Sequence, residues 1–326
     1  MVLSDFLLGF VFLIQLGVGI AGNFFLLGLS SFTLFNGKRL KPKEYIFIHL
    51  ALANSKVLLS KGIPHVMVCF GIKNFLDHLG CKLIACLQNV ARSVSLSISC
   101  LLSGFQVITI SPSNSRLAEI KSQAQKYIAP SCCFCWFFNL LINLTLLGTM
   151  HNSRYLTNNT KVWHLGYCSI LTPAFFNAAV FVLLFSIPDV MYVGFMIWAS
   201  VYLMFLLHKH HQHVKHIHSS HLSPRTFPEK RATHAILLLV STYISFYSIH
   251  SSLSFYLFKM DKHQPWFVAT LNLLGTLFPA INPFALIFCN SQVLKYRYVL
   301  RHRKHHPLLC HTVINHVPFQ NPTLTL

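Results

Sequence analysis

Acidic side chains are nearly absent from this sequence. Asp and Glu together number 7 in 326 residues, and charged residues of all kinds make up only 10% of the chain. Soluble domains carry about 25% charged residues, which give them a polar surface over an apolar core. This composition therefore excludes an ordinary soluble enzyme. Hydrophobic residues make up 54% of the chain, which also excludes a disordered protein, because disorder requires low hydrophobicity.

Motifs of the common enzyme and carrier classes are missing as well. The sequence contains no Gly-x-Ser-x-Gly, His-Glu-x-x-His or Walker-type run, the motifs that mark esterases, zinc proteases and nucleotide-binding proteins. No Lys lies between Trp266 and Cys289, where a retinal-type pump would need one. Paired intramembrane acids, which are common in transporters and channels, are also missing. We therefore expect no catalytic residues, no cofactor and no bound metal.

Long apolar runs are what the sequence does contain. A helix needs about 20 apolar residues to cross the roughly 30 Å hydrocarbon core of a bilayer. Seven runs reach that length, at about residues 6–35, 45–70, 81–110, 127–150, 177–207, 232–258 and 266–289. The pattern predicts an all-α membrane protein, with a bundle of seven transmembrane helices in residues 1–289 and a basic tail in residues 290–326.

The distribution of basic residues predicts the orientation of the bundle. The stretch 170–207 is long enough for two spans, with a turn signal at Pro188. If it is counted once, 17 Lys and Arg fall on one side of the membrane and 6 on the other. Counting it twice would move the last two basic clusters to the opposite face. Because cytoplasmic loops are enriched in Lys and Arg, we predict seven spans, an outer N-terminus and a cytoplasmic C-terminus.

Two short runs carry a family resemblance. His49-Leu50-Ala51-Leu52-Ala53-Asn54 lies in the second span, and Phe105-Gln106-Val107-Ile108-Thr109-Ile110-Ser111-Pro112 ends the third. Over about residues 20–290 the chain resembles the vomeronasal type-1 receptors, and the second run is highly specific to that family. The resemblance implies a G-protein-coupled receptor in the plasma membrane that detects small organic chemosensory cues. It implies a heterotrimeric G protein of the inhibitory type as the partner.

Three alternatives to this function remain open. A bitter-taste-type receptor shares the seven-span plan, although the run 105–112 speaks against it. A receptor-like membrane protein that no longer signals is the second, because Asn89 stands where the family usually has a basic residue and Lys56 where it is usually apolar. A transporter is the third, and the missing intramembrane acids disfavour it.

The chain has a net charge of +19. We expect its basic residues to contact anionic lipid head groups and the G protein, and we expect no binding of nucleic acid.

Charges inside the spans mark the candidate ligand site, because such residues usually face the bundle interior and are paired or functional. Under a structural interpretation, Asp189 pairs with one base, Lys61 reaches the outer interface and Arg92 bonds polar neighbours. Under a functional interpretation, an outer cavity with excess positive charge binds an acidic or sulfated small molecule. The candidate ligand-binding residues are Lys56, Lys61, Gln88, Asn89, Arg92 and Asp189.

Two covalent modifications are expected on the outer side. The receptor resemblance implies a disulfide between Cys81 and Cys168, although the ten cysteines allow other pairings. The sequon at Asn158 lies in the second outer loop, where glycosylation can occur. A second sequon, at Asn143, lies within the fourth span and is out of reach.

Prolines mark the expected switch elements. Asn282-Pro283 in the last span is a candidate hinge, because Pro removes a backbone donor and bends a helix; a static kink is the alternative. Ser111-Pro112 stands where rhodopsin-like receptors carry an Asp-Arg-Tyr switch. Seven His between residues 208 and 221 invite a zinc interpretation. No Cys accompanies them, so we expect a basic extension of the fifth helix at the inner membrane surface.

Overall fold

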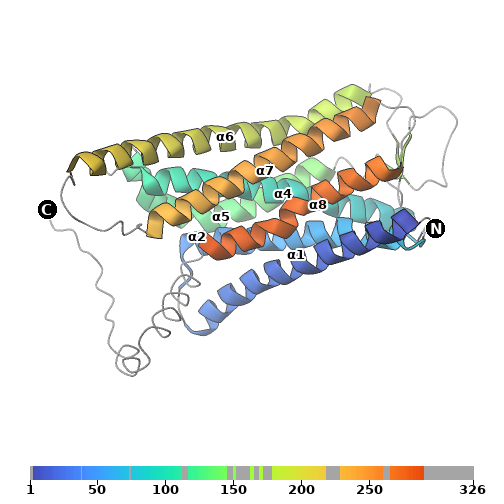
Figure 1. Ribbon diagram of the computed structural model, residues 1–326, viewed down its shortest axis with the longest axis horizontal. Helices are drawn as coiled ribbons and strands as arrows, with labels where there is room; N and C mark the ends of the chain where they lie inside the picture. Colours follow the sequence, from blue (N-terminus) through green and yellow to red (C-terminus); the bar gives the residue numbers. More distant parts are fainter. Residues whose placement is uncertain are drawn as a thin grey trace.

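The computed structural model describes residues 3–37, 39–72, 75–111, 117–144, 150–151, 162–164, 169–171, 178–217, 228–259 and 265–289. Its long helices lie side by side in one elongated bundle (Figure 1). The described helices are α1 (Leu3–Phe35), α2 (Pro42–Val57), the short α3 (Ile63–Cys69), α4 (His78–Ile110), α5 (Leu117–Leu144), α6 (Ala178–Ile217), α7 (Pro228–Lys259) and α8 (Pro265–Cys289). A π-helical turn, η1 (Leu58–Gly62), joins α2 to α3, so that Pro42–Cys69 forms a single continuous span.

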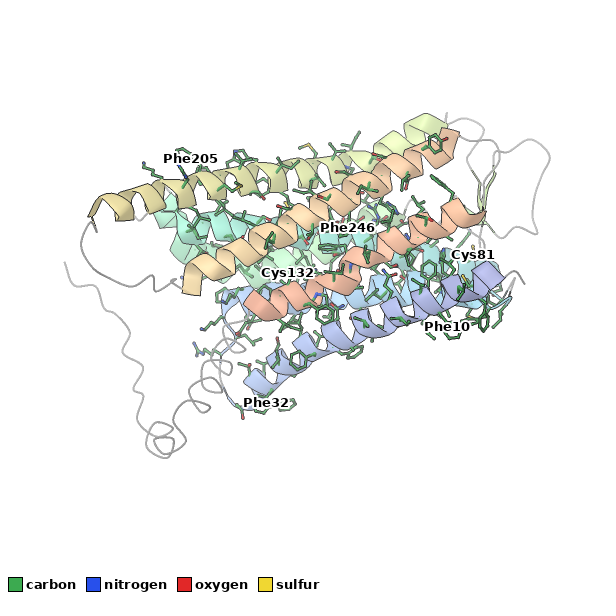
Figure 2. The ribbon with its side chains drawn as sticks, viewed as in Figure 1. Phe10, Phe32, Cys81, Cys132, Phe205 and Phe246 are labelled. Carbon is green, nitrogen blue, oxygen red and sulfur yellow. The ribbon has the colours of Figure 1, made fainter. Side chains whose placement is uncertain are left out.

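The length and the apolar surface of the helices suit a membrane. Within the described ranges, six helical segments are long and apolar enough to cross a bilayer: Phe6–Phe35, Pro42–Cys69, Leu79–Ile110, Lys126–Leu144, Ser186–Lys209 and Phe267–Ile287. Helix α7 lies among them, between α6 and α8. Large apolar side chains such as Phe32 and Phe205 point outward from α1 and α6 (Figure 2) and are 57% and 62% exposed. A surface this apolar is unusual in water, and the chain is therefore a helical membrane bundle.

The helix boundaries decide one open question and correct one prediction. Helix α6 runs through Pro188 without interruption from Ala178 to Ile217, so this segment contributes one span. Helix α5 ends at Leu144, whereas we expected the fourth span to reach Met150. Met150 instead begins strand β1 (Met150–His151). The expectation was wrong because a short apolar run is compatible with a helix or a strand, and periodicity does not separate the two.

A small sheet lies at the end of the bundle where α4 begins. Strands β1, β2 (Val162–His164) and β3 (Ser169–Leu171) are antiparallel in the order β1-β3-β2, and Ile170 of β3 pairs with both Met150 and Trp163. Strand β1 contacts α4. The all-α prediction thus holds for the spans, whereas a sheet was not foreseen in the segment between α5 and α6.

Helix α4 is the central element of the bundle. It packs against α2, α5 and α6, and the wholly buried side chains at its contacts include Leu96, Ile98 and Met196. Its buried Ser99 and Ser103 donate to backbone carbonyls one turn earlier. The hydroxyl groups of these serines thus find their hydrogen-bond partners within the helix. Because the side chains are small, neighbouring helices can approach α4 closely.

The topology can be tested at Asn158, which lies outside the described residues. We expect the receptor expressed in mammalian cells to shift to lower mass on a gel after glycosidase treatment, and Asn158→Gln to abolish the shift, because only an outer loop meets the glycosylation machinery. Asn143→Gln is the matched control, since Asn143 is buried in α5 at 4% exposure, and it should leave the shift intact. An untreated and a treated wild-type band of equal mass would contradict the predicted site or the predicted orientation.

Candidate functional site

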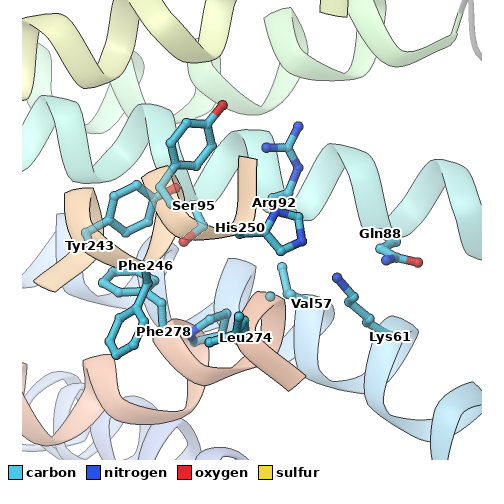
Figure 3. Close-up of a pocket in the computed structure, with 13 residues that line it drawn as sticks. Val57, Lys61, Gln88, Arg92, Ser95, Tyr243, Phe246, His250, Leu274 and Phe278 are labelled. Carbon is cyan, nitrogen blue, oxygen red and sulfur yellow. The ribbon is translucent and has the colours of Figure 1, made fainter. Parts of the chain in front are cut away.

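A cavity of about 60 Å³ lies between four of the spans (Figure 3). Its walls come from the α2–η1 segment, α4, α7 and α8. The lining residues are Val57, Lys61, Gln88, Arg92, Ser95, Tyr243, Phe246, Tyr247, His250, Leu274, Gly275, Phe278 and Pro279. This volume holds about two water molecules, so the cavity in this conformation accommodates one polar head group. A larger ligand requires the helices to move apart.

An ion pair ties three helices together beside the cavity. Arg92 Nη1 on α4 lies 2.6 Å from Asp189 Oδ2 on α6, and Tyr247 Oη on α7 donates to the same oxygen at 3.0 Å. The Asp189 side chain is 5% exposed. Asp189 comes directly after Pro188 and faces the bundle interior because α6 stays helical there. The charge of Arg92 is therefore already neutralised by a protein carboxylate.

The Lys61 side chain points into the bundle and does not extend to the outer membrane interface. It is 7% exposed and points into the cavity towards His250 (Figure 3). A Cβ atom built on Gly275 of α8 would overlap the Lys61 ammonium and lie 3.1 Å from His250 Nε2. The structural interpretation, in which Lys61 reaches the outer interface, is thus wrong for this residue. A π-helical turn holds one extra residue, which rotates the following side chains around the helix axis and brings Lys61 inward.

The remaining candidates separate into two groups. Gln88 lines the cavity beside Lys61. Lys56 is exposed on the outside of α2, with its ammonium 4.3 Å from the centre of the Trp136 ring on α5. Trp136 Nε1 in turn donates to His49 Nδ1 at 3.2 Å. Asn89 is half-buried on α4 and does not line the cavity. The structure therefore brings Lys61, Gln88 and Arg92 together and keeps Lys56 and Asn89 apart from them.

Sequence reasoning missed the contributions of α7 and α8 to this cavity. His250 Nε2 is buried and has no hydrogen-bond partner among the described residues. Because His250 is an imidazole in the middle of an apolar run, the sequence alone could have marked it as a candidate site residue. Gly275, by contrast, carries no sequence signal. The space that its missing side chain leaves for Lys61 appears only when the helices pack together.

The predicted hinge lies deeper on α8. Pro283 has no N–H to donate to the carbonyl of Pro279 one turn earlier, and Asn23 Nδ2 on α1 donates to that carbonyl at 3.1 Å. Asn282 is 1% exposed, and neither of its side-chain polar atoms has a partner within the described part of the chain. Ser111 ends α4 and is buried, while Pro112 lies outside the described residues. The carbonyl that Pro283 leaves without a helical donor is thus satisfied by α1, and the role of Pro283 as a hinge stays a prediction.

Cys81 anchors the sheet end of the bundle. It is wholly buried in the first turn of α4 and takes part in a disulfide. None of the described cysteines 69, 86, 100, 132, 133 and 135 is disulfide-bonded. Cys168 lies outside the described residues, directly before β3, whose partner β1 contacts α4. The Cys81–Cys168 pairing remains a prediction.

Comparison with known proteins assigns the chain to a family. Residues 6–298 match the model of the vomeronasal organ pheromone receptor family. The human vomeronasal type-1 receptor 1 is 42% identical over 296 residues, 91% of this chain and 84% of that protein. The human vomeronasal type-1 receptor 3 is 42% identical over 285 residues, 87% and 91% of the two chains. The zebrafish (Danio rerio) olfactory receptor class A-like protein 1 is 30% identical over 291 residues, 87% and 90%. This chain is therefore a multi-pass membrane receptor of the vomeronasal organ pheromone receptor family.

Proposed function

We propose that this receptor detects small organic chemosensory molecules at the plasma membrane and passes the signal to a heterotrimeric G protein of the inhibitory type. Its N-terminus lies outside the cell, and its C-terminal tail lies in the cytoplasm. The observation that carries the proposal is the interhelical cavity, because Gln88 and Arg92 in its lining lie in the half of α4 that also holds Cys81, and because the cavity joins spans that a ligand could displace. Membership of the vomeronasal organ pheromone receptor family supports the chemosensory role.

A route for the signal follows from the residues along α8. Gly275 and Phe278 line the cavity, and Asn282-Pro283 follows about one turn beyond Phe278. A ligand that moves the cavity wall shifts the equilibrium between two packings of α8. The unpartnered side chain of Asn282 can gain hydrogen bonds in the second packing. The movement would then reach the cytoplasmic ends of α4 and α8, where the G protein binds.

Filling the cavity tests the proposal. We screen small organic acids, alcohols and amines on cells that carry a promiscuous G-protein reporter, and then compare Gly275→Leu with the wild type. The larger side chain occupies the space beside Lys61 and His250. The response to any active compound should therefore fall at least about tenfold, the effect of losing one charge-assisted contact.

The matched control is Gly28→Leu on α1, because a Cβ at Gly28 meets nothing within 4 Å. This variant should respond as the wild type does, and both variants should reach the cell surface in equal amounts. A wild-type receptor that binds a compound without activating the reporter would favour the alternative that the protein no longer signals. A full response in Gly275→Leu would place the ligand elsewhere.

A further inference from the structure

We infer that this cavity is an anion site in which Lys61 and His250 recognise the acidic group of an amphipathic ligand, while Arg92 does not. The inference rests on the proposed function, because it assumes that the cavity is where the ligand binds. It goes further by naming the chemical class of the ligand and the residues that select it. It also assigns the charge contact to Lys61 and not to Arg92, which was another of the candidate ligand-binding residues.

The charges around the cavity carry the first step. Arg92 is paired with Asp189 at 2.6 Å, and Tyr247 donates a hydrogen bond to the same carboxylate oxygen. No carboxylate is among the described residues that line the cavity. Lys61 is 7% exposed, and within the described ranges its ammonium makes neither a hydrogen bond nor an ion pair. A buried ammonium without a counter-charge is unfavourable, so an anion that enters this cavity gains an attraction that no protein group supplies.

A second polar group points to the same place. His250 Nε2 is buried without a partner among the described residues, and a Cβ on Gly275 would lie 3.1 Å from it while overlapping the Lys61 ammonium. The absence of a side chain at Gly275 thus leaves one small space that both groups face. An oxygen atom of a carboxylate, sulfate or sulfonate placed there can accept from the ammonium and from a protonated Nε2.

One end of the cavity is cationic and the other is aromatic, and this difference determines which ligand structure can bind. Lys61 and Gln88 lie at one end, with His250 beside them, and Tyr243, Phe246 and Phe278 lie at the other (Figure 3). On α4, Gln88 is closer than Ser95 to Cys81, so the cationic end is nearer the predicted outer surface. Once the helices have moved apart, a ligand that fits has an apolar or aromatic body, which packs against the rings, and one anionic group, which faces the outer side.

The test uses the full-length receptor purified in lipid nanodiscs, with benzenesulfonate and benzenesulfonamide as paired probes that differ in charge. A probe that binds the folded state raises the melting temperature. We expect benzenesulfonate to raise it in the wild type, and the apparent affinity to fall at least about tenfold in Lys61→Gln. Lys61→Arg should recover most of the effect because it keeps the charge. The neutral sulfonamide should give the same small shift in every variant.

The control is Lys56→Gln, which removes a lysine five residues earlier in the same span that lies outside the cavity; it should respond as the wild type does. Benzenesulfonate binding that is absent in the wild type, or unchanged in Lys61→Gln, would overturn the inference. If Lys61→Gln does not fold, His250→Gln serves as the second variant and should weaken sulfonate binding selectively. Sulfonate binding without G-protein activation would leave this inference standing and reject the proposed signalling function.

Discussion

Asp189→Asn is expected to destabilise the folded receptor by about 2 kcal/mol, less than the loss of a fully buried ion pair would cost, because the Asp189 side chain is 5% exposed but that of Arg92 is 35% exposed. The substitution keeps the shape of the side chain and removes the charge that neutralises Arg92, 2.6 Å away. The guanidinium would then remain in the bundle without a counter-charge, and the hydrogen bonds that join α4, α6 and α7 at residue 189 would be weaker. The loss is measured as a lower melting temperature of the purified receptor and as a smaller fraction at the cell surface.

The double variant Arg92→Met with Asp189→Leu separates the ion pair from the packing around it. Replacing a buried pair by apolar residues of similar size is often neutral or stabilising, so the double variant should be more stable than Asp189→Asn alone. Tyr247→Phe removes one hydrogen bond to Asp189 and should destabilise the receptor by only about 1 kcal/mol. If Asp189→Asn melts at the wild-type temperature, Arg92 does not depend on this carboxylate.

Cys81→Ala should have the other large effect, a destabilisation of about 2–5 kcal/mol with loss of the receptor from the cell surface. Cys81 is wholly buried and disulfide-bonded, and the bond joins the first turn of α4 to another part of the chain. If Cys168 is the partner, Cys168→Ala should show the same loss, and the double variant should be no worse than either single one.

Cys86→Ala is the control for this pair, because Cys86 is a free cysteine five residues further along α4. It should reach the surface at close to the wild-type level, measured by antibody labelling of an N-terminal tag on intact cells. Normal surface expression of Cys168→Ala beside a failing Cys81→Ala would show that Cys81 pairs with a different cysteine.

The helical bundle could be predicted from the sequence because the bilayer imposes a simple requirement. A span must hide its backbone polar groups in a helix about 20 residues long, and seven apolar runs of that length stand out in this chain. The continuity of α6 through Pro188 agrees with counting that segment once. The prediction was wrong at Met150, where six residues beyond α5 the chain forms a strand, because local hydrophobicity does not encode a partner strand.

The candidate site was only partly predictable, for a different reason. Composition identified the few charges inside the spans, because each one is unfavourable in hydrocarbon and stands out there. Which way each side chain points depends on helix rotation. The turn η1 brings Lys61 into the cavity, whereas Lys56, five residues earlier, faces outward against Trp136. Hydropathy treats the two lysines alike.

By itself, the sequence determined the helical membrane bundle and the family of this receptor, since both depend on runs of neighbouring residues. Only the tertiary structure decided that Asp189 pairs with Arg92, 97 positions away in the chain, and that His250 and Gly275 face Lys61. These relations depend on how the helices pack and rotate against one another. A one-dimensional pattern records which side chains are present, and only the packed helices determine which charge is neutralised and which one has no counter-charge beside it.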